Sequence, residues 1–416
     1  MTTSDPTEAY VWVWLPDAGA PVVAGLLEEQ RTGLITFTYG RSYLSRADAI
    51  PLYVPELPLR SGRIEPLPGL SMPSAIRDAG PDSWGQRVIL ARHAGRLTRD
   101  SDTADLGPLT YLLESGSNRV GALDFQSRPD QYVPRGDGAT LDDLASAAQA
   151  LDAGEELPPE LGEALVRGTS IGGARPKALI EDGERHLVAK FSSATDTYPV
   201  VRAEALGMLL AGAAGVRVPP VEVTRSLGRD VLLVERFDRT PVRGERRQMV
   251  SALTMLGLDE MMGRYATYVD LADIVRARFT EPGATLTELF RRIAVNICIG
   301  NTDDHARNHA AFWDGTDLSL TPAYDLCPQP RGGREANQAM AFGAQGQRAS
   351  RLALLREAAP VYQLSVAAAG QIIEEVVTAI RDSYRDCADR AHLSAVEAAR
   401  LLGRQILNPY ALERLG

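Results

Sequence analysis

The sequence is short of cysteine, of aromatic residues and of positive charge. Its 416 residues include three cysteines, Cys298, Cys327 and Cys387, which lie too far apart for a disulfide framework or a zinc motif. Aromatic residues make up 6% of the chain, and 54 acidic residues against 44 Lys and Arg give a net charge of −10. No strongly basic domain stands out, which argues against direct binding of nucleic acid by this chain alone.

Long apolar runs are also missing. The chain has no stretch of eighteen apolar residues, and its first residues carry neither a basic region nor an apolar leader. These absences predict a cytoplasmic protein that does not enter a membrane, and the cysteine usage fits a reducing compartment. Cys298 and Cys327 are expected to lie in the core.

The remaining composition is that of an ordinary globular protein. Hydrophobic residues make up 44% and charged residues 24% of the chain, and the length allows two or three domains. We expect an α+β protein with a β-rich N-terminal module (1–127), a second lobe that is also β-rich (128–240) and a helical lobe (241–416). The segment 126–139, rich in Pro, Gly and charge, is expected to be a linker.

Local patterns predict individual elements. Apolar residues alternate with threonine over 35–39, which predicts a half-buried strand, and Thr140 with Asp143 resembles a capping box at the start of a helix. Two strand-like runs around residues 227–230 predict a hairpin. Helical spacing of apolar residues from Leu286 to Cys298 predicts a buried helix that begins with a Thr285–Glu288 capping box and stops at Gly300. Another helix is expected around 372–380.

Three polar residues late in the chain point to phosphoryl transfer. Asn308 follows Asp303 by five residues and Asp325 follows it by twenty-two. A kinase needs a carboxylate base near the acceptor hydroxyl, and it needs an amide and a second carboxylate that bind magnesium. The Asp303 loop begins where the predicted helix ends, so the helix would give the loop a rigid support.

Segments upstream supply the other parts of a kinase in the expected order. The glycine-bearing segment 168–177 can bring backbone amides close to phosphates, although a tight turn before a strand is the plainer interpretation of it alone. Lys190 is a lone cation in an apolar strand, and Glu204 on the next helix is its candidate partner. An outward-pointing surface lysine and an acid favoured by the helix dipole are the alternatives. The extended segment 234–239 is a candidate hinge that would meet adenine through its backbone.

This order of segments resembles the HipA family of bacterial serine/threonine kinases, the toxins of toxin–antitoxin pairs. The resemblance rests on the local sequences at 169–177, 187–191, 234–239, 300–308 and 320–325, and covers nearly the whole chain. It implies a HipA-like kinase fold. The run His-Gln-Glu-Asp of other members is missing from 246–255, which leaves the protein substrate open.

The resemblance also implies roles for single residues. Asp303 would be the catalytic base, Asn308 and Asp325 would hold magnesium, Glu204 would form the structural ion pair with Lys190, and Ser170 would be a regulatory autophosphorylation site. The nucleotide site would be formed by Gly172, Gly173, Ala174, Arg175, Pro176, Lys177, Lys190, Glu235, Arg236, Phe237, His305, Ala306, Arg307, Asn308, Tyr324 and Asp325. His305 is equally well interpreted as a buried structural histidine.

Taken together, the sequence predicts an ATP- and magnesium-dependent protein serine/threonine kinase acting as a toxin. The family resemblance implies the partners: a translation-related protein substrate, such as an aminoacyl-tRNA synthetase, and a separately encoded DNA-binding antitoxin, through which alone the chain would meet DNA. Two other classes remain open. One is a kinase-like corepressor subunit without catalysis, and the other is a small-molecule phosphotransferase, which shares the Asp-x4-Asn spacing but should lack autophosphorylation at Ser170.

Overall fold

The computed structural model describes residues 5–94, 101–136, 140–153, 155, 175–193, 196–240 and 244–414. They divide into two compact units. Unit 1 comprises 1–196, 225–250 and 312–316, and unit 2 comprises 197–224, 251–311 and 317–416. The boundaries expected near residues 127 and 240 both fall inside unit 1, so the three-domain division stays a prediction.

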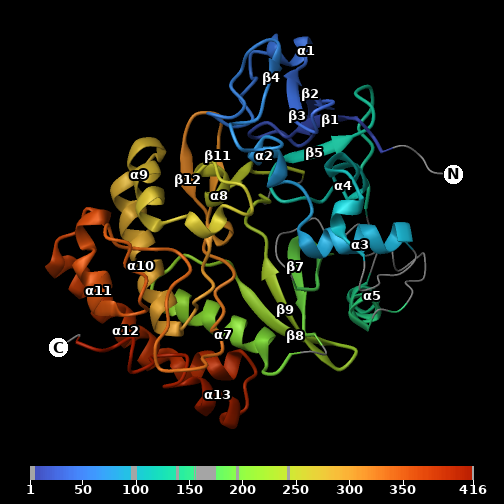
Figure 1. Cartoon of the computed structure of the whole chain (residues 1–416). Coiled ribbons are helices and arrows are strands. Elements are labelled where there is room, and N and C mark those ends of the chain that lie inside the picture. Colours follow the sequence, from blue (N-terminus) through green and yellow to red (C-terminus); the bar gives the residue numbers. More distant parts are fainter. Residues whose placement is uncertain are drawn as a thin grey trace. The chain divides into compact units, whose positions relative to one another are not determined.

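Unit 1 begins with a five-stranded antiparallel sheet in the order β4-β3-β2-β1-β5 (Figure 1). The expected strand at 35–39 is confirmed as β3, and its apolar residues join the sheet's buried core. The strands are β1 (Glu8–Val13), β2 (Val22–Glu29), β3 (Ile35–Tyr39), β4 (Arg63–Ile64) and β5 (Leu123–Gln126). The helices between β3 and β5 are α1 (Arg41–Leu44), α2 (Ser74–Arg77), α3 (Ser83–Ala94), the 3-10 turn Thr103–Asp105 and α4 (Pro108–Glu114).

A second, smaller sheet in unit 1 is covered by helices. Strands β6 (Lys177–Asp182), β7 (Arg185–Phe191) and β9 (Arg229–Glu235) pair antiparallel, with β7 in the middle. Side chains of α3 and α5 (Leu141–Ala153) share one buried cluster with these strands. The expected cap of α5 is confirmed, since Asp143 N–H donates to Thr140 Oγ1 over 3.1 Å and Thr140 N–H donates back to Asp143 Oδ2 over 3.0 Å.

The expected hairpin is also confirmed. Strand β8 (Val221–Ser226) is joined to β9 by Leu227 and Gly228, both of which adopt positive φ. Such a two-residue turn matches the right-handed twist of the strands it joins. The boundary between the units falls within β8, and also within β10 (Met249–Ser251) and β11 (Ala310–Trp313).

Unit 2 is mainly helical. It contains α7 (Val200–Ala213), α8 (Ala252–Met255), α9 (Tyr268–Arg278), α10 (Pro282–Ile299), α11 (Leu352–Glu357), α12 (Val366–Arg390), α13 (Ala395–Leu401) and the short strand β12 (Leu318–Leu320). The 3-10 turns lie at Gly263–Tyr265, Ala306–Asn308 and Ala359–Tyr362. Helix α12 confirms the helix expected around 372–380. Among the described residues, no helix combines the length and apolarity needed to cross a membrane.

Helix α10 supports the loop of greatest interest. Its apolar side chains are buried, and Gly300 ends the helix in the left-handed conformation with φ of 71°, as expected. The expected capping box at Thr285 and Glu288 is wrong, because the helix already begins at Pro282. Proline fits the first helical position since its missing N–H would have no partner there. Cys298, Cys327 and Cys387 are all buried, which confirms the expectation for the first two.

Candidate active site

The loop after α10 starts with a sharp reversal of the chain. Gly300 N–H donates to the Ile297 carbonyl over 3.3 Å, and Asn301 N–H donates to the Asn296 carbonyl over 2.9 Å. A Cβ atom on Gly300 would lie 2.6 Å from the Gln405 carbonyl oxygen, far inside van der Waals contact. Both the positive φ and this close approach require glycine, so the start of the loop is fixed by the backbone.

The two adjacent aspartates of the loop differ in exposure. Asp303 is exposed, whereas Asp304 is 1% exposed. Asn296 Nδ2 donates to Asp304 Oδ2 over 2.5 Å, and the Tyr268 hydroxyl donates to the same oxygen. His309 Nε2 lies 3.1 Å from the other oxygen, Asp304 Oδ1. Asp304 therefore anchors the loop internally to α9 and α10 and leaves Asp303 facing outward.

The anchor extends to the first residue of the loop. Asn301, itself buried, donates from Nδ2 to Asn296 Oδ1 over 3.0 Å. The side-chain amide of Asn296 thus accepts from Asn301 through its oxygen and donates to Asp304 through its nitrogen. A buried polar network of this kind restricts a loop to one conformation when its members find partners. The arrangement would hold the Asp303 carboxylate at a fixed place. A general base needs such a position, because it must lie within hydrogen-bond reach of the hydroxyl.

The sequence analysis missed the residues of this anchor. The pattern Asp303-Asp304 offers two equivalent acids, and only burial separates the exposed one from the anchor. Tyr268 is thirty-six residues upstream of Asp304, a separation at which no spacing rule applies. The histidine interpretation is corrected as well: His305 is exposed, and His309 is the buried structural histidine.

Asn308 lies on the same loop, in a 3-10 turn. Its Nδ2 donates to the Asp303 carbonyl over 3.3 Å, and its backbone N–H donates to the His305 carbonyl over 2.9 Å. Because the amide nitrogen faces the Asp303 backbone, the amide oxygen is the atom of this side chain that would serve as the predicted metal ligand. Magnesium prefers such oxygen ligands and commonly takes only one or two from the protein when nucleotide phosphates supply others.

The predicted second metal ligand, Asp325, has an unusual backbone. Its φ is 62°, which a residue with a side chain adopts at a cost of about 1–3 kcal/mol. Two contacts hold its neighbours against the catalytic loop: the Tyr324 hydroxyl donates to the Arg307 carbonyl over 2.7 Å, and Gln329 N–H donates to the Gly300 carbonyl over 3.0 Å. The oxygen chemistry of Asn308 and Asp325 fits magnesium. No cluster of three His, Cys, Asp or Glu side chains suited to a metal occurs in the described part of the chain.

The predicted phosphate-binding residues lie in unit 1. Lys190 is half-buried on β7, directly across from Lys177 on β6. Lys177 is 3% exposed, and its Nζ lies 3.1 Å from Asp82 Oδ2, so this lysine has a buried partner of its own. Arg175 pairs with Asp196 at 2.8 Å. Ser170, Gly172, Gly173 and Ala174 lie outside the described residues.

Glu204 is buried on α7 in unit 2, 4% exposed. Its predicted pairing with Lys190 would join residues of different units and stays a prediction.

The predicted hinge leaves the end of β9. Glu235 and Phe237 are half-buried, while Arg236 is 7% exposed and hydrogen-bonded within unit 1. The Phe237 ring lies 6.1 Å from the ring of Phe312 in a T-shaped contact. The Arg236 side chain is therefore turned into unit 1, whereas the side chains of Glu235 and Phe237 are partly open.

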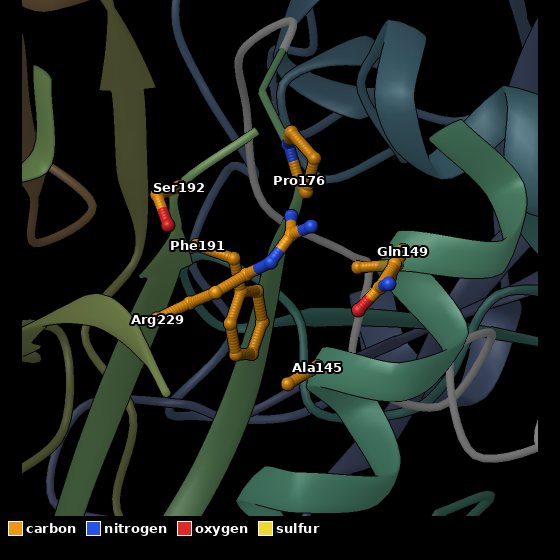
Figure 2. A pocket seen from close by; sticks show the side chains of 7 residues that line it. Ala145, Gln149, Pro176, Phe191, Ser192 and Arg229 are labelled. Carbon is orange, nitrogen blue, oxygen red and sulfur yellow. The ribbon is translucent and has the colours of Figure 1, made fainter. Parts of the chain in front are cut away.

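Unit 1 also contains a pocket against the covered sheet. Ala145, Ala148 and Gln149 of α5 line it together with Pro176, Phe191, Ser192 and Arg229. Figure 2 shows the Arg229 side chain extended along the Phe191 ring toward Pro176. Pro176 is the residue of this lining that the sequence analysis assigned to the nucleotide site.

Comparisons with known proteins identify the family. Residues 169–384, just over half of the chain, match the HipA-like C-terminal domain, and residues 13–126 match the HipA N-terminal domain. "Putative kinase Y4mE" of Sinorhizobium fredii is 27% identical over 336 residues, which are 73% of this chain and 74% of that protein. The serine/threonine-protein kinase toxin HipA of Shewanella oneidensis is 27% identical over 184 residues, 38% of this chain and 42% of that protein.

Solved structures agree on the fold. A structure of HipA from Shewanella oneidensis MR-1, in complex with HipB and operator DNA, matches with a TM-score of 0.67 at 20% identity. The match covers 95% of this chain and 96% of the other. At that identity the likeness establishes the fold, here an α+β HipA-like kinase fold. With both domain matches in place, this chain belongs to the HipA family and is a HipA-like kinase, a phosphotransferase.

Proposed function

We propose that the chain is an ATP- and magnesium-dependent protein serine/threonine kinase that acts as the toxin of a toxin–antitoxin pair. The observation that carries the proposal is the catalytic loop. Asp303 is exposed on a loop whose neighbour Asp304 is buried and hydrogen-bonded, and Asn308 is attached to the Asp303 backbone. This arrangement supports the proposal, in which the Asp303 carboxylate would meet a substrate and the Asn308 amide oxygen would meet a metal.

The loop supports a direct transfer of the γ-phosphoryl group. In this proposal the Asp303 carboxylate orients the acceptor hydroxyl of serine or threonine and accepts its proton. A bond forms between the acceptor oxygen and the γ-phosphorus, and the bond from that phosphorus to the bridging oxygen of ADP breaks. Lys190 would hold the nucleotide phosphates, and Glu235 to Phe237 would meet adenine.

Asn308 and Asp325 would hold magnesium. When bound, the ion offsets the negative charge that develops on the phosphate oxygens. The chain's own contribution is the fixed placement of two oxygen ligands, one on the anchored loop and one at the left-handed position Asp325.

Regulation by autophosphorylation is part of the proposal. A phosphate on Ser170 would add almost two negative charges within the glycine segment that is proposed to hold the phosphates of ATP. Repulsion between the two sets of phosphates would displace the segment from its binding conformation. A kinase that modifies itself there would therefore inhibit itself.

Partners are proposed from the family and its relatives. The related Shewanella HipA was solved with HipB and operator DNA, which supports a separately encoded antitoxin for this chain and contact with DNA only through it. The net charge of −10 fits indirect contact, because phosphate backbones attract basic surfaces. A translation-related protein, such as an aminoacyl-tRNA synthetase, is the proposed substrate.

The experiment is a phosphorylation assay with three proteins. Wild type, Asp303→Asn and Asp382→Asn are incubated with magnesium and labelled ATP, and the products are analysed by intact mass and peptide mapping. Asp382 is an exposed aspartate on α12, so its variant controls for the loss of one surface charge. We expect phosphate on Ser170 in wild type and Asp382→Asn, and at least a hundredfold less in Asp303→Asn.

Two results would contradict the proposal. ATP binding without phosphate on any protein, with or without a bacterial lysate as substrate, would favour the corepressor interpretation. Phosphate transferred only to small molecules would favour a small-molecule phosphotransferase.

A further inference from the structure

The predicted hinge segment has a partly open side and a buried side. Along 235–238, Glu235 and Phe237 are half-buried, while Arg236 and Asp238 are 7% and 4% exposed. Side chains of an extended segment point alternately to opposite sides. One side is therefore open to a ligand, and the other is held inside unit 1.

The buried side centres on the Asp238 carboxylate. Arg236 donates to it through Nε over 2.9 Å and through Nη2 over 2.7 Å, a two-pronged contact. Arg239 Nη1 donates to Oδ2 over 2.9 Å, and the backbone N–H of Gly121 donates to the same oxygen over 2.8 Å. One carboxylate thus binds two guanidinium groups and reaches a backbone amide more than a hundred residues earlier in the sequence.

The segment 118–121 completes the arrangement. Asn118 Oδ1 accepts from Arg236 Nη1 over 2.7 Å and from Arg239 Nη2 over 2.9 Å. The carbonyl of Arg119 accepts from Nη2 of both arginines, over 2.5 and 2.7 Å. The segment directly precedes β5 of the N-terminal sheet, so these bonds tie the hinge to that sheet.

The backbone favours glycine at the contact itself. Gly121 has φ of +76°, and a Cβ atom there would lie 3.2 Å from the backbone nitrogen of Met249. The segment after the hinge is held too, since Arg247 N–H donates to the Asp238 carbonyl over 2.9 Å. Backbone on both sides of the hinge residues is therefore fixed by the same group of contacts.

From these contacts we infer that Asn118 and Asp238 are positioning residues for the nucleotide base, and that the N-terminal sheet sets the adenine affinity of the kinase through them. This inference rests on the proposed function, in which Glu235 to Phe237 meet adenine. Both buried guanidinium groups donate to the Asp238 carboxylate, and its loss would remove the negative charge that offsets them. The hinge backbone would then move to find new acceptors, and small misplacements weaken binding strongly.

The test separates the base of ATP from its phosphates. Binding of magnesium-ATP and of magnesium-tripolyphosphate is measured by calorimetry for wild type, Asp238→Asn, Asn118→Ala, Asn118→Asp and Asp130→Asn. Asp130 pairs with Arg128 at the surface of unit 1, with both side chains more than half exposed, and its variant is the matched control. Asn118→Asp keeps the acceptor oxygen that both arginines use.

We expect Asp238→Asn and Asn118→Ala to raise the Kd for ATP at least about tenfold while the Kd for tripolyphosphate stays within about twofold. Asn118→Asp and Asp130→Asn should match wild type. Asn118→Ala retains the Asp238 carboxylate, so it tests the inference even if Asp238→Asn fails to fold.

Unchanged ATP binding in folded Asn118→Ala would overturn the inference. An equal loss of ATP and tripolyphosphate binding would overturn it as well, because general damage and not base positioning would be the cause. Wild-type protein that binds no ATP would refute the proposed function and, with it, the inference.

Discussion

Replacing Asp304 by asparagine should loosen the loop that carries Asp303, without changing any exposed side chain of that loop. The Asp304 carboxylate is buried and accepts from Asn296 Nδ2 and the Tyr268 hydroxyl, with His309 Nε2 at 3.1 Å. Asparagine has nearly the same shape but exchanges one acceptor oxygen for a donor. The new NH2 group then faces either Asn296 Nδ2 and the Tyr268 hydroxyl, which both donate, or His309 Nε2, which accepts from it only in the tautomer without a proton on Nε2.

The size of the effect follows from these contacts. A hydrogen bond to a buried charged group contributes about 1.5–3 kcal/mol, and a donor left without an acceptor adds a desolvation cost. We therefore expect Asp304→Asn to lower the free energy of unfolding by about 2–4 kcal/mol. Because Asp303 is held by the same loop, kcat should fall about ten- to a hundredfold.

The assay combines urea unfolding, steady-state kinetics and amide hydrogen exchange over residues 301–309. Asp382→Asn, an aspartate exposed on α12, serves as the matched control and should behave as wild type in all three. Faster exchange in the loop together with reduced kcat would support the anchor. Asp304→Asn with wild-type unfolding, exchange and kcat would refute the reasoning, because no buried charged acceptor could then be supporting the loop.

Two further predictions concern packing and pH. Gly207→Ala should destabilise the protein and lower kcat, because its Cβ would lie 2.1 Å from the Leu326 carbonyl oxygen, next to Asp325. Gly370→Ala, with its nearest neighbour at 3.7 Å, should be neutral or stabilising by up to about 1 kcal/mol, and equal melting temperatures for the two variants would contradict the packing argument. Burial alone would raise the pKa of Asp238, but the charges of Arg236 and Arg239 lower it well below its usual value. The stabilisation by its carboxylate is then fully present above a pH of about 4, the usual pKa of aspartate, and is lost as the pH falls through the lowered value. In urea unfolding, Asp238→Asn should lower the free energy of unfolding by a constant amount between pH 5 and 8 and by a smaller amount below about pH 4. A loss of stability that grew in acid would show that the sign is wrong.

Much of the local structure could be predicted from the sequence. The strand at 35–39, the cap at Thr140, the hairpin turn at 227–228 and the helix stop at Gly300 all follow from interactions between residues close in the chain. The beginning of α10 was predicted wrongly, because the Thr285–Glu288 pair fits the capping pattern while Pro282 starts the helix one turn earlier. Patterns between neighbouring residues identify helices and strands well, but several such signals can compete for the residue at which an element begins or ends.

The candidate site was likewise predicted only in part. The spacing of Asp303, Asn308 and Asp325 indicated phosphoryl transfer, and the family match is consistent with it. The roles of the single residues stay predictions, including that of Ser170, which lies outside the described residues. The supports of the site could not be predicted, because Tyr268 and Asn296 meet Asp304 only after α9 and α10 have packed.

The sequence by itself determined that the chain belongs to the HipA family and is a HipA-like kinase, since both depend on residue types at short spacings. Tertiary structure alone decided which of two adjacent aspartates is buried, which histidine is structural, and which side of the hinge is tied to the N-terminal sheet. The physical reason is burial. Whether a charged side chain serves as an exposed reactive group or as an internal anchor depends on the partners and the solvent around it, and distant parts of the chain supply both.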